Sequence, residues 1–93
     1  MLITNFFSYE AAHVFIYESL TISKVKNTDE MYSQLTDREQ VFLNQTLVRL
    51  MFNNIIELKD TDPKKPCIST KGRIIYSFNE VELFRLYKKA TNQ

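Results

Sequence analysis

Residues 36–54 read TDREQVFLNQTLVRLMFNN and carry the strongest helical pattern in the chain. Thr36 and Glu39 form a capping box, in which each side chain accepts a hydrogen bond from the backbone amide of the other residue. Apolar residues then recur at the spacing of one helix face: Leu43, Leu47, Leu50 and Met51. The pair Asn53-Asn54 tolerates the left-handed conformation with which helices commonly end. The sequence therefore predicts one continuous helix over residues 37–52.

Two weaker helical patterns precede this segment. Ser8 is a suitable N-cap, and Glu10 stands in the first turn, where a negative charge is favourable. Apolar side chains follow at helical spacing: Ala12, Phe15, Ile16 and Leu20. These signals predict a helix over residues 9–20. Residues 29–35 are predicted to form a short helical turn, which supplies the helix before residues 37–52.

The pattern changes after the two asparagines. Residues 55–59 are rich in β-branched side chains and predict a strand, and both prolines lie in the turn cluster of residues 60–66. Residues 67–70 are expected to return as a second strand, which makes an antiparallel hairpin with a charged tip. From residue 73 onward, Ile74, Ile75 and Phe78 stand at helical spacing, and Asn79 with Glu82 gives a further capping signal. We expect one kinked helix or two short ones, ending at about Lys89.

Length and composition limit what the chain can be. Its 93 residues, 44% of them hydrophobic, suit one domain over residues 1–93. The expected fold class is α+β and mostly α. No apolar run is long enough to span a membrane, and residues 1–7 show neither the basic start nor the cleavage site of a secretory signal. A single cysteine fits a reducing compartment, so the predicted location is the cytoplasm.

Catalysis and metal binding find little support in the sequence. His13 is the only histidine and Cys67 the only thiol, and they belong to different predicted elements, so a nucleophile pair is not indicated. One His and one Cys are too few ligands for a structural zinc site. The single glycine excludes glycine-rich phosphate loops. We therefore expect no enzymatic activity, no catalytic residue, no metal and no cofactor.

Residues 46–77 resemble the second half of winged-helix domains. The segments that carry the resemblance are TLVRLMFNNIIEL, DPKKP and ISTKGRII. They are most similar to the small bacterial regulators of the MarR, PadR and HxlR type, in which a recognition helix leads into a strand, a charged wing, a second strand and a last helix. Residues 69–73 (STKGR) stand where that last helix is approached in those families. The resemblance implies a winged-helix-like domain with three N-terminal helices, a two-stranded wing hairpin and a C-terminal helical segment.

The resemblance also implies binding to double-stranded DNA. Asn and Gln pair well with adenine edges and Arg with guanine, and lysines around the hairpin could contact phosphates. The candidate nucleic-acid-binding residues are Asn44, Gln45, Thr46, Arg49, Lys64, Lys65, Lys71 and Arg73. The net charge is only +1, with three basic and six acidic residues over 1–43 and nine basic and five acidic over 44–93. A strongly basic stripe is therefore missing.

Aromatic residues are abundant at both ends of the chain. Seven Phe and five Tyr are many for this length, and they can either fill a small core or form an interface. The candidate dimer or partner-interface residues are Phe7, Phe15, Phe84 and Tyr87. With the resemblance, they predict a homodimer that associates through the first and last helices.

Two functions follow from these observations. The first is a winged-helix DNA-binding protein, a transcriptional regulator or accessory factor. The second is a non-catalytic protein-interaction module of similar fold that does not bind DNA, such as an accessory or inhibitory factor of a phage or mobile element. A continuous positive face joining Arg49, Lys64, Lys65 and Arg73 would favour DNA, whereas interrupting acidic groups would favour a protein partner.

Overall fold

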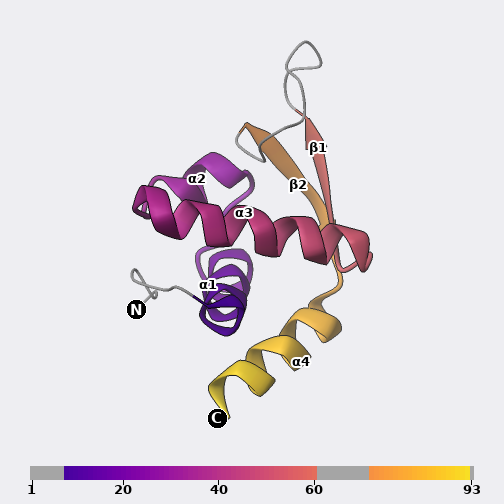
Figure 1. The fold of residues 1–93 in the computed structure, drawn as a ribbon. Helices are drawn as coiled ribbons and strands as arrows, with labels where there is room; N and C mark the ends of the chain where they lie inside the picture. The colour runs from indigo at the N-terminus through magenta and orange to yellow at the C-terminus, as the bar shows by residue number, and fades with distance from the viewer. Residues whose placement is uncertain (1–7, 61–71, 93) are drawn as a thin grey trace.

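A computed structural model describes residues 8–60 and 72–92 of the chain. Over these residues the fold is α+β and mostly helical, with four helices and one two-stranded antiparallel hairpin (Figure 1). The elements are α1 (Tyr9–Thr21), α2 (Thr28–Tyr32), α3 (Asp37–Phe52), β1 (Ile56–Asp60), β2 (Arg73–Phe78) and α4 (Glu80–Thr91). The predicted fold class and the predicted order of three helices, hairpin and C-terminal helix are confirmed.

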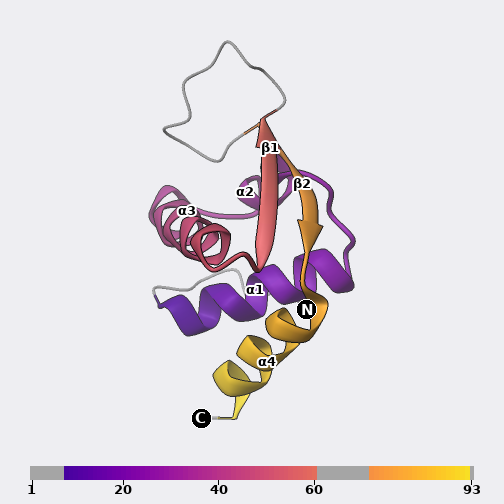
Figure 2. The ribbon, with the colours of Figure 1, turned by 90° about the vertical axis from the view of Figure 1, so that its right-hand side faces the viewer.

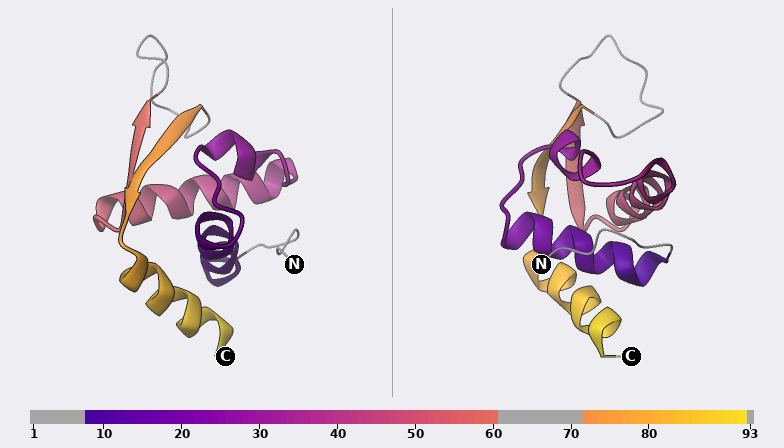
Figure 3. Two further views of the ribbon diagram at one scale, coloured as in Figure 1. Left: turned by 180° about the vertical axis from the view of Figure 1, so that it is seen from behind. Right: turned by 90° about the vertical axis from the view of Figure 1, so that its left-hand side faces the viewer.

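Helix α1 lies in the middle of the molecule. In Figure 1, α1 is seen end-on beneath α3, which runs across the view. In Figure 2, α3 is seen end-on and α1 runs across the view, so the two helices cross. On the other side of α1 lies α4, which turns away from the hairpin and runs along α1 (Figures 2 and 3). The core forms around this arrangement, because α1 is covered from both sides.

The core combines apolar side chains from every element. Its fully buried members come from α1, α2, α3 and α4: Ala12, Phe15, Ile16, Met31, Leu43, Leu47, Leu50 and Leu83. Ile56 and Leu58 of β1 add the inward face of the hairpin. Phe15, which the sequence suggested as an interface residue, is 0% exposed and therefore offers no surface to a partner.

The capping box of α3 forms as predicted. The backbone amide of Thr36 donates to Glu39 Oε1 over 2.9 Å, and the amide of Glu39 donates to Thr36 Oγ1 over 3.3 Å. At the other end Asn53 is the C-cap and Asn54 has a φ of 59°, so the chain leaves the helix through the left-handed region. The predicted helix over residues 37–52 is confirmed.

The first two helices also begin at the expected signals. Ser8 Oγ accepts from the amide of Ala11 over 3.2 Å, and α1 ends one residue later than predicted. The predicted helical turn at 29–35 is the short helix α2, which is capped by Asn27 and ends at Tyr32. Residues 33–36 connect α2 to α3, so the two helices and this short connection form a helix–turn–helix.

The prediction that the chain is helical from residue 73 onward is wrong over 73–78, because these residues form β2. Their apolar spacing fits a helix, but β1 supplies a partner strand: Leu58 pairs with Ile75 and Ile56 with Phe78. The other edge of β2 is held by a hydrogen bond of 2.9 Å from the amide of Ile75 to the carbonyl of Lys26. The predicted second strand at 67–70 lies outside the described residues.

The final helix starts at its own cap instead. Asn79 Oδ1 accepts from the amide of Glu82 over 3.1 Å, as the capping signal predicts. The helix then runs from Glu80 to Thr91, two residues beyond the predicted end.

Replacing Thr36 by Ala tests whether the capping box holds the start of α3. The variant Thr36→Ala should lower the free energy of unfolding by about 1 kcal/mol, because the amide of Glu39 loses its acceptor. Urea denaturation followed by circular dichroism measures this, with Thr36→Ser, which keeps the hydroxyl, as the matched control. Equal stability of the two variants would contradict this role.

Candidate functional site

The α3 residues expected to contact DNA differ in their surroundings. Thr46 is 0% exposed, and its hydroxyl donates to the carbonyl of Phe42 over 2.7 Å, so it cannot reach a base. Asn44 is half-buried and accepts a hydrogen bond of 3.3 Å from the hydroxyl of Tyr32. These two residues serve the interior of the domain.

Gln45 and Arg49 are exposed, and both contact Tyr9 at the start of α1. The Tyr9 hydroxyl donates to Gln45 Oε1 over 3.1 Å. The guanidinium of Arg49 lies 4.2 Å from the centre of the Tyr9 ring, which is a cation–π distance. Tyr9 therefore connects Gln45 and Arg49 of α3 to the start of α1.

The hairpin candidates are described only in part. Arg73 is half-buried in β2, and its Nη1 donates to the sulfur of Met51 at the end of α3 over 3.7 Å. Lys64, Lys65 and Lys71 lie outside the described residues. The structure thus places Arg73 beside the C-terminal end of α3.

The face of α3 that points away from the core carries two exposed apolar side chains. Val41 is 55% and Phe52 83% exposed, and between them stand Gln45, which is exposed, and Val48, which is half-buried. Their spacing of four, three and four residues places the side chains in one row along the helix. We call Val41, Gln45, Val48 and Phe52 the outer face of α3.

Sequence reasoning missed this surface. It identified a single apolar face on this helix, formed by Leu43, Leu47, Leu50 and Met51, and did not consider Val48 and Phe52 as a separate row. The signal that distinguishes them is the second row itself, which repeats at the spacing of a coiled-coil seam on the side opposite Leu43, Leu47 and Leu50.

The helix–turn–helix of α2 and α3 carries three exposed carboxylates. Asp29 and Glu30 of α2 and Asp37, the first residue of α3, are exposed, and Arg38 is the neighbouring cation. Over residues 8–60 and 72–92 the chain carries nine basic and ten acidic side chains. The described part of the chain is therefore close to neutral, and three of its exposed carboxylates lie on the helix–turn–helix.

The predicted interface residues of α4 form a cluster with α1. The ring of Tyr17 stacks on the ring of Tyr87, with centroids 4.5 Å apart. The centroid of the Phe84 ring lies 5.7 Å from that of Tyr17. Phe84 is 45% exposed, and Val81 on the same helix is 76% exposed. Phe7 lies outside the described residues. The homodimer through these helices stays a prediction.

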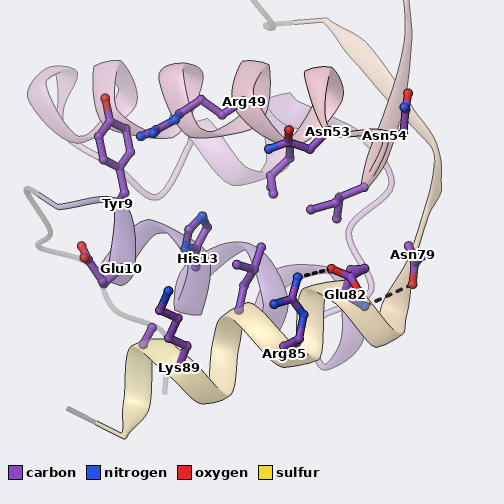
Figure 4. A pocket seen from close by; sticks show the side chains of 14 residues that line it. Tyr9, Glu10, His13, Arg49, Asn53, Asn54, Asn79, Glu82, Arg85 and Lys89 are labelled. Carbon is purple, nitrogen blue, oxygen red and sulfur yellow. Dashed lines mark hydrogen bonds and ion pairs between the residues drawn. The ribbon is translucent and has the colours of Figure 1, made fainter.

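A cleft of about 550 Å³ lies between α1, the C-terminal end of α3 and α4 (Figure 4). His13 is half-buried at its centre, and Arg49, Arg85 and Lys89 bring positive charges to it. Arg85 is paired with Glu82. Burial lowers the pKa of His13 from its ordinary value of 6.5; Glu10 opposes this shift, and Arg49 and Lys89 add to it. The imidazole is therefore neutral at pH 7.

Comparisons with known proteins do not assign a function, so the assignment rests on the geometry of the domain. No protein-family model matches the chain, and no curated protein or solved structure matches it significantly. Over the described residues, no three His, Cys, Asp or Glu side chains gather as metal ligands would. Each helix in that part of the chain is also too short or too polar to cross a bilayer.

The pKa of His13 tests the charge arrangement of the cleft. We expect a value below 6.5, lowered further in Glu10→Gln and raised in Lys89→Gln, since these changes remove opposite charges. Nuclear magnetic resonance measures it directly, because His13 is the only histidine. A raised pKa in Glu10→Gln or a lowered pKa in Lys89→Gln would contradict the arrangement.

The same shift makes stability depend on pH. Because folding lowers the pKa, the unfolded chain binds the proton more tightly. The stability that His13 contributes is therefore complete above pH 6.5 and declines as pH falls below that value toward the folded pKa.

Proposed function

We propose that this protein is a winged-helix-like protein-interaction module without catalytic function, which binds its partner through the outer face of α3. The observation that carries the proposal is the exposure of Val41 and Phe52, at 55% and 83%, on the helix that would enter a DNA groove in a winged-helix regulator. A row of exposed apolar side chains is typical of a protein interface. A DNA groove offers such a row little beyond thymine methyl groups.

The order of elements supports the winged-helix part of the proposal. Helices α2 and α3 are joined by residues 33–36, and the antiparallel hairpin follows α3 directly (Figure 1). This is the order that the resemblance to the MarR, PadR and HxlR type of regulator implies. Within residues 8–60 and 72–92, Val41 and Phe52 of α3 remain exposed in this arrangement.

Electrostatics support a protein partner over DNA. In a DNA-binding helix–turn–helix, the N-terminal residues of the second helix approach base edges while the first helix crosses the phosphate backbone. Here Asp37 starts the second helix, and Asp29 and Glu30 lie on the first. Three carboxylates at that position would repel phosphates.

The spacing of the outer face indicates what the partner offers. Arg38, Val41, Gln45, Val48 and Phe52 repeat at intervals of three and four residues, which is the seam spacing of two helices packed side by side. The partner is therefore expected to present an amphipathic helix whose apolar side covers Val41 and Phe52. Gln45 in the middle of the seam would favour one register.

Charge placed on the outer face should abolish partner binding. Immobilised wild-type protein is expected to retain a partner from the cells that express it, and the variant Val41→Glu/Phe52→Glu to lose that partner, because two carboxylates would be buried in an apolar contact. Val81→Glu, at a residue 76% exposed on α4, is the matched control. Circular dichroism checks that all three proteins are folded.

One outcome of this experiment would contradict the proposal. If wild-type protein, the double variant and Val81→Glu retain the same proteins in the same amounts, the outer face of α3 is not the binding surface.

DNA binding through the hairpin is the second candidate. Lys59 of β1 is exposed, and the segment that follows carries Lys64, Lys65 and Lys71 in its sequence. These lysines would bind phosphates on duplex DNA without contacting base edges.

Salt dependence tests this candidate. If the hairpin binds DNA, changing Lys64 and Lys65 to Ala should flatten the slope of log affinity against log salt by roughly two. Because these lysines contact no base edges, the affinity should fall about equally on all DNA sequences. Absence of salt-dependent affinity for duplex DNA in the wild type at about 50 mM salt would exclude DNA binding.

A further inference from the structure

Two positive charges in the cleft between α1, α3 and α4 lack a carboxylate partner. Within residues 8–60 and 72–92, neither Arg49 nor Lys89 forms an ion pair, whereas the guanidinium of Arg85 is bound to Glu82. In Figure 4, Arg49 extends from α3 above His13, and Lys89 extends from α4 below it. His13 of α1, Arg49 of α3 and Lys89 of α4 therefore line the same cleft from three different helices.

The rest of the lining suits the body of a small organic molecule. Leu86 and Ala90, which are half-buried, supply apolar surface, and Asn53 and Asn54 supply amide groups at the end of α3. The volume of about 550 Å³ lies within the range of small-molecule sites. A ligand with a charged group at one end and an apolar body at the other would match this arrangement.

We propose that this cleft binds a small organic anion, whose carboxylate or phosphate lies between Arg49 and Lys89 and whose apolar body contacts Leu86 and Ala90. Tyr9 fixes Arg49 in place, because its ring lies 4.2 Å from the guanidinium carbon. A guanidinium stacked in this way keeps its N–H groups available at the edge for a carboxylate or phosphate oxygen.

Glu10 is the acidic group that opposes an anion at this place. It is exposed on α1 and points away from the centre of the cleft in Figure 4, so water screens its charge. Glu82, the other carboxylate of the lining, is already occupied by Arg85. The centre of the cleft therefore remains favourable to negative charge.

His13 reports on the ligand without a label, because it is the only histidine and lines the cleft. The probes are adenosine monophosphate and benzoate, each compared with its uncharged analogue, adenosine and benzamide. An anion beside His13 should raise the pKa of the imidazole, since negative charge favours the protonated form. The uncharged analogues should leave that pKa unchanged, and the tighter of the two anions identifies phosphate or carboxylate as the preferred group.

Variants then locate the contact. Arg49→Gln and Lys89→Gln should each weaken binding of the preferred anion by about tenfold, because each removes one charge-assisted hydrogen bond. Lys88→Gln is the matched control, because Lys88 lies over the Phe84 ring and does not line the cleft. Thermal unfolding shows that each variant is folded, and Arg49→Lys, which keeps the charge, replaces Arg49→Gln if that variant unfolds.

The proposal is overturned if neither anion changes the His13 signal at about 10 mM, or if Lys89→Gln binds as well as Lys88→Gln. This outcome is independent of the partner proposed above, because Val41 and Phe52 do not line the cleft. The variant Val41→Glu/Phe52→Glu should bind the anion with unchanged affinity.

Discussion

The burial of α1 from two sides is the constraint on which the rest of the structure depends. Phe15 and Ile16 are completely buried, and covering them requires α3 on one side of the helix and α4 on the other (Figures 1 and 2). Helix α3 uses its leucine row for this contact, so its opposite face stays exposed. Helix α4 approaches α1 beside the end of α3, and the cleft around His13 lies where the three helices meet.

Both candidate surfaces follow from this packing. The outer face of α3 exposes Val41 and Phe52, and Asp37 places an exposed carboxylate at the start of the helix, which is unfavourable for DNA and compatible with a protein helix. The cleft has the opposite character, with Arg49 and Lys89 around a neutral imidazole. The two surfaces share no lining residue and are open to independent tests.

Local signals in the sequence predicted the helix boundaries well. Ser8, Thr36 and Asn79 are N-caps as expected, and Asn54 ends α3 through a positive φ, because capping depends on residues within one turn. Strand β2 was missed because the spacing of Ile74, Ile75 and Phe78 fits a helix, and pairing with β1 decides the outcome.

The site was harder to predict than the fold. The burial of Thr46 and the exposure of Phe52 depend on which face of α3 meets α1, and the sequence of α3 carries apolar residues on both faces. The cleft unites His13, Arg49 and Lys89, which are far apart in sequence and come together only through the packing of three helices. The amino-acid composition does not indicate that these three side chains lie in one cleft.

The most direct test of the central claim places the photoreactive amino acid benzoylphenylalanine at position 52 in the living cell, with position 81 as the control. Both native side chains are highly exposed, so exposure alone favours neither position. Our account predicts a light-dependent adduct with a protein from position 52 and no such adduct from position 81. An adduct with DNA from position 52, or identical adducts from both positions, would contradict it.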